Sequence, residues 1–175
     1  MVVILFLVNL WAVYREHNAK AAATQAIQLT EATDKIRFQM MQNRLNLSSY
    51  LLSGDSREAE HMNEGIISLS EKILAAERLV ASDQQKDALE KMRQIEQAWA
   101  KEFAGAMVEK RQQVDNGNST VAELQVFYLQ KDAASWIKTA SENLDLADQE
   151  NRTLLEERRQ SDATATTATI VISLV

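Results

Sequence analysis

The stretch that decides the fold is residues 49–76, which read SYLLSGDSREAEHMNEGIISLSEKILAA. Gly54 suits the left-handed conformation in which many helices end, and Asp55 and Ser56 are residue types that cap the start of a helix. After the caps, apolar side chains recur in steps of four and three, at Met62, Ile66, Leu69, Ile73 and Ala76, and the pattern continues to Val80. Because this is the period of an amphipathic helix, the stretch predicts two helices joined by a short turn, and short turns make neighbours antiparallel.

Two further places interrupt the helical pattern. Ser82 and Asp83 are capping residue types, and acidic Asp87 follows in the first turn of the next helix. Residues 115–120 (DNGNST) form the longest polar cluster, and Glu123 comes three positions after Thr120, as in a capping box. Together the breaks predict four helices, near residues 15–52, 57–81, 84–114 and 120–162.

The other predicted helices also carry apolar residues at helical spacing. The first has a main stripe of Ile27, Phe38, Met41, Leu45 and Leu52. Beside this stripe runs a second edge of Ile36, Met40, Leu47 and Leu51. The third has Leu89, Met92, Ile95, Trp99, Phe103 and Ala106. The fourth has Leu124, Phe127, Ile137, Leu144, Ala147, Leu154 and Leu155. We therefore expect an all-α fold, an antiparallel up-down-up-down four-helix bundle.

The composition agrees with this fold and excludes several functions. The 175 residues include no proline, no cysteine and four glycines, and 6% are aromatic. A chain so poor in helix breakers favours helices throughout. The formal net charge of −6 argues against a nucleic-acid partner, which needs a basic face.

Both ends of the chain are apolar. Residues 1–14 (MVVILFLVNLWAVY) and 163–175 (ATATTATIVISLV) carry no charge, and each is shorter than the roughly 20 residues of a membrane-spanning helix. We expect them to be truncated transmembrane helices flanking a helical domain at 15–162, because Trp11 and Tyr14 suit a membrane boundary. The alternatives for the first run are a signal peptide, with Ala19-Lys20-Ala21 as a cleavage site, and a buried core helix.

The predicted topology places both chain ends together, and the helix lengths agree with it. At 1.5 Å per residue, the first and fourth helices are roughly 57 and 65 Å long and the other two roughly 38 and 47 Å. In an up-down-up-down bundle both chain ends lie at one end, so a single bilayer holds both. The two long helices would overhang there as a stem.

Three stretches resemble a known family. Residues 49–55 (SYLLSGD) are similar to Gly-Tyr-Leu-Leu-Thr-Gly-Asp in CHASE-type sensor domains of the third subfamily, and residues 109–111 (EKR) and 150–158 (ENRTLLEER) also fit. The likeness covers most of residues 38–159. It departs at Ser48 and Ser49, where the family commonly has Arg followed by Gly. The four-helix-bundle sensor of chemoreceptors is a close competitor with the same architecture.

The resemblance implies an extracytoplasmic (periplasmic) sensor, homodimeric, in a bacterial receptor of the inner (cell) membrane. A methyl-accepting chemotaxis protein is the first expectation, with signal transduction through a HAMP-like relay to a cytoplasmic output. The partners would be the membrane, a second copy, and a small-molecule ligand or a ligand-binding protein. The alternatives are the sensor of a histidine kinase or nucleotide cyclase, a purely structural membrane-anchored bundle, and a soluble helical enzyme or carrier.

The chain has no glycine-rich phosphate loop, nucleophile elbow or metalloprotease motif, so we expect no enzymatic activity, cofactor or metal. The ligand hypothesis involves Arg37 and Arg44, seven residues apart on one helix, which can hold a carboxylate bidentately. The alternative is two surface arginines beside Asp34.

A second hypothesis is an aromatic pocket lined by Trp99, Tyr128 and Trp136, with core packing as its alternative. Signalling is expected as a small sliding or rotation of the first and fourth helices. The fourth helix's stripe is interrupted by Lys131 and Asn151, and polar residues in a seam weaken it and fix its register.

Overall fold

The computed structural model describes residues 2–173, with their side chains except those of residues 2–8, 12, 19, 150, 154, 158 and 161–173. All secondary structure in this part of the chain is helical, so the predicted all-α class is confirmed. The elements are α1 (Val2–Ser53), α2 (Ser56–Glu77), α3 (Asp83–Ala98), the π-helix η1 (Trp99–Ala104), α4 (Gly105–Asp115), α5 (Val121–Gln130) and α6 (Ala133–Ser173).

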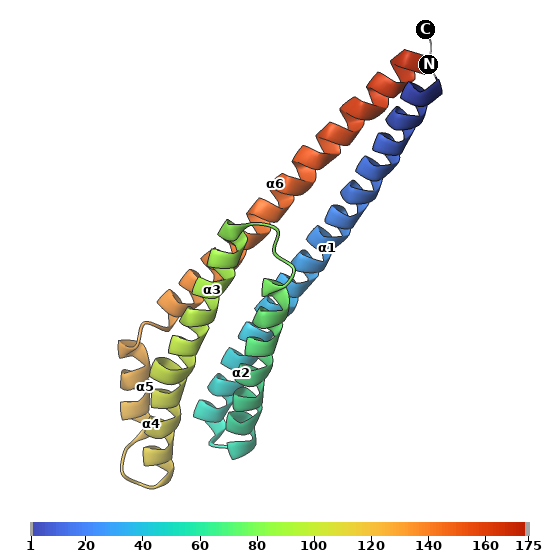
Figure 1. Ribbon diagram of the computed structural model, residues 1–175. Coiled ribbons are helices and arrows are strands. Elements are labelled where there is room, and N and C mark those ends of the chain that lie inside the picture. The colour runs from blue at the N-terminus through green and yellow to red at the C-terminus, as the bar shows by residue number, and fades with distance from the viewer. Residues whose placement is uncertain (1, 174–175) are drawn as a thin grey trace.

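The two longest helices, α1 and α6, run side by side, and the start of α1 lies at the same end of the molecule as the end of α6 (Figure 1). Along the chain, α2 packs on α1, and α3 packs on α6, while α1 also contacts α6. The turn between α1 and α2 and the turn between α4 and α5 both lie at the opposite end, which we call the turn end.

The predicted turns are confirmed. Gly54 ends α1 with a φ of +74°, a conformation that side chains disfavour, and Asp55 caps α2 with its carboxylate. Ser82 caps α3 with its hydroxyl. Thr120 and Glu123 form the predicted capping box at the start of α5. These local signals therefore placed the turns, although α2 ends at Glu77 rather than at residue 81.

The predicted single fourth helix is wrong, because two helices, α5 and α6, occupy that range. Lys131 has an extended backbone, with φ −97° and ψ 100°. Asp132 Oδ1 then accepts the backbone N–H of Ser135 at 3.1 Å, which starts α6. Short polar side chains of this kind compete with the helical backbone for its N–H groups and favour helix starts. Lys131 lies exposed at the break, 5.4 Å from the Phe127 ring centroid, and does not interrupt a buried seam.

The third predicted helix contains an unpredicted π-helical turn, η1. Trp99, Phe103 and Ala104 are all buried within it, and Met107 follows as the next buried residue. A π turn holds more residues than an α turn. The core face therefore passes to Met107, and the predicted core residue Ala106 is only partly buried.

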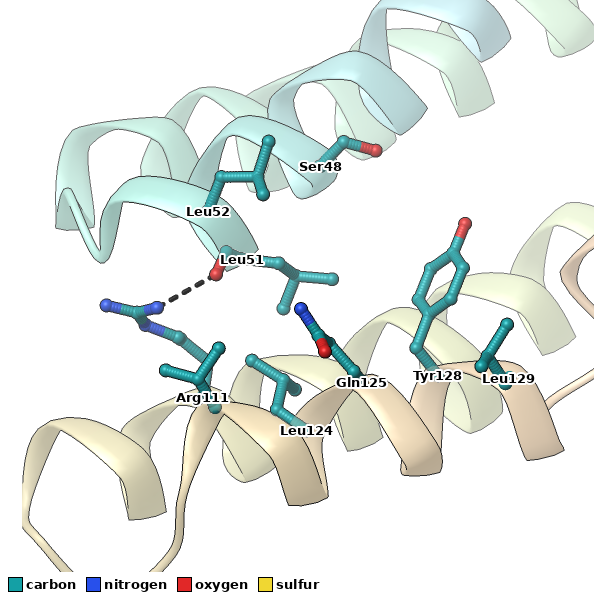
Figure 2. A pocket seen from close by; sticks show the side chains of 9 residues that line it. Ser48, Leu51, Leu52, Arg111, Leu124, Gln125, Tyr128 and Leu129 are labelled. Atoms are coloured by element: carbon teal, nitrogen blue, oxygen red, sulfur yellow. Dashed lines mark hydrogen bonds between the residues drawn. The ribbon is translucent and has the colours of Figure 1, made fainter.

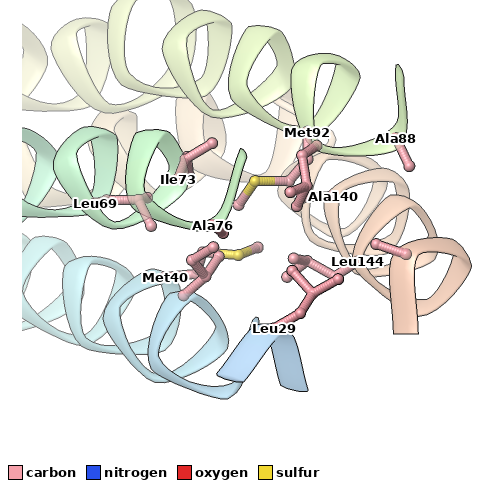
Figure 3. Packing of buried hydrophobic residues seen from close by; sticks show 12 residues of the cluster. Leu29, Met40, Leu69, Ile73, Ala76, Ala88, Met92, Ala140 and Leu144 are labelled. Atoms are coloured by element: carbon pink, nitrogen blue, oxygen red, sulfur yellow. The ribbon is translucent and has the colours of Figure 1, made fainter. Parts of the chain in front are cut away.

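Side chains from α1, α2, α3 and α6 meet in one hydrophobic core, shown in Figure 3. Its buried members are Leu29, Ile36, Met40, Leu69, Ile73, Ala76, Ala88, Leu89, Met92, Ala140, Leu144 and Ala147. A second cluster lies nearer the turn end and consists of Leu47, Met62, Trp99, Phe103, Ala104 and Met107. The predicted stripe of α2 is largely confirmed, whereas Ile137 of α6 is exposed and Ala140 is buried instead.

The predicted main stripe of α1 is wrong as a core face. Phe38 is 62% exposed and Leu52 is 85% exposed, and Ile27, Met41 and Leu45 are exposed as well. The second edge faces the core, with Ile36, Met40 and Leu47 buried. Both stripes have helical spacing, so the period alone does not say which one α2 and α6 cover.

The predicted transmembrane helices, residues 1–14 and 163–175, fall largely on residues whose side chains lie outside the described part of the chain. Within the described residues, no helix contains an apolar stretch long enough to cross a membrane. The sensor-domain range of 15–162 corresponds to the remainder of α1 through most of α6.

Candidate functional site

Arg37 joins α1 to α6 through two carboxylates. Its Nη2 lies 2.8 Å from Asp145 Oδ1 and 2.9 Å from Asp148 Oδ2. Asp148 is buried, and its other oxygen accepts a hydrogen bond from the Thr33 hydroxyl at 2.7 Å. The Arg37 side chain is itself two-thirds buried, so this pair is an interhelical contact and not a solvated surface charge.

Arg44 joins α1 to α3 and η1. Its Nη2 lies 2.6 Å from Glu96 Oε1, its Nη1 donates to the Met40 carbonyl at 2.9 Å, and its guanidinium lies 4.9 Å from the Trp99 ring centroid. Glu96 is only 5% exposed. Burial raises the pKa of Glu96 because it disfavours the charged carboxylate, and Arg44 opposes this shift.

Both arginines line one cavity of about 430 Å³ between α1 and the α5–α6 segment. We call it the arginine cavity, and its walls are Arg37, Met40, Met41, Arg44, Leu45, Ser48, Tyr128, Ile137 and Ser141. Its size is in the range of small-molecule sites, which are mostly apolar with a few polar groups. The structure thus brings together three residues of the two ligand hypotheses, namely the two arginines and Tyr128.

The two tryptophans do not line the arginine cavity. Trp99 is 2% exposed, stacks on Phe103 with ring centroids 6.3 Å apart, and lies beneath the Arg44 guanidinium. Trp136 is partly buried against the same core cluster. Tyr128 reaches this group through Phe103, whose ring it meets edge-on at 5.8 Å. The two tryptophans therefore belong to the packed core, the alternative to the aromatic pocket, and only Tyr128 lines the arginine cavity.

A second cavity, of about 420 Å³, lies at the turn end and was not predicted. We call it the turn-end cavity, and Figure 2 shows that the end of α1 faces α4 and α5 across it. Its walls are Ser48, Leu51, Leu52, Arg111, Val121, Leu124, Gln125, Tyr128 and Leu129. No sequence signal joined these residues, because they come from three helices whose approach is a tertiary contact.

Ser48 and Tyr128 belong to both cavities, so the two adjoin along α1. Within the described residues, no group of three or more His, Cys, Asp or Glu side chains has the arrangement of a metal site. The chemistry of the two cavities suits the binding of a ligand. The arginine cavity has two guanidinium groups in its walls, and the turn-end cavity beside it is mostly apolar with one guanidinium at its edge.

The functional interpretation rests on the residues of this chain. No protein-family model matches it, and no curated protein or solved structure shows significant similarity to it. The resemblance to CHASE-type sensor domains stays a prediction from the motifs at residues 49–55, 109–111 and 150–158.

Proposed function

We propose that this chain is the extracytoplasmic sensor module of a bacterial transmembrane receptor, with a ligand carboxylate acting at the arginine cavity. In this proposal the helices form an antiparallel up-down-up-down bundle, with α3, η1 and α4 together as the third member and α5 and α6 as the fourth. The packing of α2 on α1 and of α3 on α6, and the core that all four share, support this arrangement.

The observation that carries the proposal is that each arginine of the cavity also ties α1 to another helix. Arg37 holds Asp145 and Asp148 of α6, and Arg44 holds Glu96 of α3. A carboxylate ligand that takes the Arg37 guanidinium competes with the aspartates for the same donors. Ligand binding and the contact between α1 and α6 are thereby coupled.

The expected effect of the ligand is a shift of α6 relative to α1. When Arg37 turns to the ligand, buried Asp148 loses its cation, and an unpaired buried charge is unfavourable by several kcal/mol. A small shift of α6 that exposes Asp148 to water removes that cost. The ligand favours the shifted state only by the difference between its affinities for the two states.

A polar layer sets the resting register of α1 against α6. The Asn151 amide donates to the Ala26 carbonyl at 2.6 Å and to the Thr30 hydroxyl at 2.9 Å, one turn of α6 beyond the Thr33–Asp148 hydrogen bond. Buried polar residues in an apolar seam specify register at a cost in stability. Such a seam has a small set of discrete alignments, which suits a switch between two states.

The exposed stripe of α1 supports a homodimer. Phe38, Met41, Leu45 and Leu52 are spaced by three, four and seven residues, which is the spacing of a coiled-coil seam. Contiguous exposed apolar residues on a soluble surface mark interaction sites. A second copy packed on this stripe would lie next to the arginine cavity, because Met41 and Leu45 also line it.

The membrane part of the proposal rests on the apolar runs at residues 1–14 and 163–175, since α1 and α6 lead toward one end of the molecule. The receptor would be a methyl-accepting chemotaxis protein in the first instance, with a histidine kinase or nucleotide cyclase as alternatives. A HAMP-like relay and a signalling module encoded beyond Val175 would identify the output. A stop codon soon after that residue would favour a structural anchored bundle.

The experiment is a chimeric receptor in which this chain replaces the sensor of a chemoreceptor, with kinase output measured against added mono- and dicarboxylates. We expect at least one carboxylate to change the output, and Arg37→Ala and Arg44→Ala to weaken that response at least tenfold. Arg78→Ala is the matched control, because Arg78 is an exposed arginine at the end of α2 that lines neither cavity, and this variant should respond like the original chain. The proposal fails if no carboxylate changes the output, or if all three variants respond alike.

A further inference from the structure

The walls of the turn-end cavity carry both apolar and polar side chains. Leu51, Leu52, Leu124, Val121 and Leu129 supply the apolar part, and Figure 2 shows the leucines of α1 facing those of α5 across the opening. Leu129 is 81% exposed, so water now covers much of this apolar surface. Covering it with an alkyl chain would release that water, which is the main favourable term in apolar binding.

Three polar groups of the cavity have no hydrogen-bond partner within the described part of the chain. They are the hydroxyl groups of Ser48 and Tyr128 and the side-chain amide of Gln125. Figure 2 shows Gln125 and Tyr128 extending from α5 toward α1. A ligand with a polar head can therefore be oriented by hydrogen bonds without breaking a protein–protein one.

The charge of the cavity favours an anion. Arg111 borders it and is mostly buried: its Nη1 donates to the Leu51 carbonyl at 2.9 Å and its Nη2 pairs with Asp115 at 2.9 Å. Its Nε is buried and has no partner among the described residues. Asp115 is the only described carboxylate paired with this guanidinium, and it is more than a third exposed, so an incoming carboxylate competes with a partly solvated one.

We propose that the turn-end cavity binds a medium-chain aliphatic carboxylate, in addition to the ligand proposed at the adjoining arginine cavity. The alkyl chain lies against the leucines of α1 and α5, and the carboxylate lies at the Arg111 end of the cavity. A volume of about 420 Å³ matches the size of such a ligand, since small-molecule sites begin near about 300 Å³. A free fatty acid and the released acyl chain of a lipid share this chemistry.

The test is isothermal titration of the full chain with octanoate, at concentrations well below those at which it forms micelles. We expect one saturable site per chain, an affinity that rises about fourfold for each methylene added from hexanoate to decanoate, and octanol binding about tenfold more weakly than octanoate. Leu129→Glu places a negative charge in the cavity at an exposed position and should weaken octanoate binding at least tenfold.

Val126→Glu is the matched control, because Val126 is also an exposed residue of α5 but does not line the cavity. Non-specific partitioning of octanoate affects both variants equally. Equal affinities of the two variants, the absence of saturable binding, or octanol binding as tightly as octanoate would each overturn the proposal.

Discussion

Nη2 of Arg44 in α1 lies 2.6 Å from Oε1 of Glu96 in α3, 52 residues away in the chain, and the two side chains are 15% and 4% exposed. The Arg44 guanidinium also covers the face of Trp99. One side chain thus fixes α1 to α3 and to the π-helix η1. The same side chain lines the arginine cavity, so Arg44 belongs both to the contact between the helices and to the proposed ligand site.

Replacing only one member of the Arg44–Glu96 pair should destabilise the folded state. Arg44→Met leaves the Glu96 carboxylate buried without its cation, and we expect it to lower the free energy of unfolding by about 3 kcal/mol. The double variant Arg44→Met with Glu96→Gln should lose less than the sum of the two single changes, because neither charge is then left alone. Urea unfolding followed by circular dichroism measures all three. Additive losses would show that the two side chains do not act as a pair.

The raised pKa of Glu96 makes stability depend on pH in a definite direction. The folded state binds this proton at a higher pH than the unfolded state does. The stability that Glu96 contributes is therefore fully present below its unfolded pKa and is lost as pH rises through its folded pKa. We expect the unfolding free energy of the original chain, relative to Glu96→Gln, to fall as pH rises above the ordinary glutamate pKa of about 4. A difference that stays constant with pH would contradict the raised pKa.

Gly65 permits the close approach of α2 to α1. A Cβ at this position would lie 2.0 Å from Asn43 Oδ1 and 2.9 Å from Gln39 Nε2. Gly65→Ala forces Asn43 to move and breaks its 3.0 Å hydrogen bond with Gln39, so we expect a loss of about 1 to 2 kcal/mol. The measurement is the midpoint of thermal unfolding.

Gly105→Ala is the control for this substitution. Its Cβ would meet only the Ala100 carbonyl, at the ordinary distance of 3.5 Å. Alanine is favoured over glycine in a helix by about 1 kcal/mol, so this variant should be as stable as the original chain or more so. A similar destabilisation of both variants would rule out the contact with Asn43 as the cause.

The exposed stripe of α1 predicts the self-association of the chain. Phe38→Glu places a charge in the middle of the stripe, and we expect it to weaken a dimer at least tenfold in sedimentation equilibrium. Ile67→Glu alters an equally exposed apolar residue on α2 and should leave the dimer unchanged. Identical behaviour of the two variants would mean that α1 is not the interface.

The fold class and the turns could be predicted because their causes are local. Gly54 adopts a left-handed backbone without a side-chain clash. Ser82 and Thr120 accept hydrogen bonds from N–H groups in the first turns of α3 and α5. The break at Lys131 and Asp132 also has a local cause, the Asp132 cap, but the apolar spacing around it masked that signal. The π-helical turn at residues 99–104 carried no comparable sequence signal.

The candidate site could be predicted only in part. The spacing of Arg37 and Arg44 placed them on one face of a helix, and both do line one cavity. Their partners Asp145, Asp148 and Glu96 lie on other helices, 52 to 111 residues away along the chain from the arginine that each one contacts. No local pattern identifies these partners. The turn-end cavity was missed for the same reason, since its walls come from α1, α4 and α5.

What the sequence by itself determined is that this chain is helical, where its turns lie and which residues share a helix face, because helical period and capping depend on neighbours within a turn or two. What only the tertiary structure decided is which face is buried. Phe38 and Met40 belong to two equally periodic stripes of α1, yet Met40 is buried and Phe38 faces water. Burial depends on where α2 and α6 pack, and their positions follow from the summed contacts of the whole core.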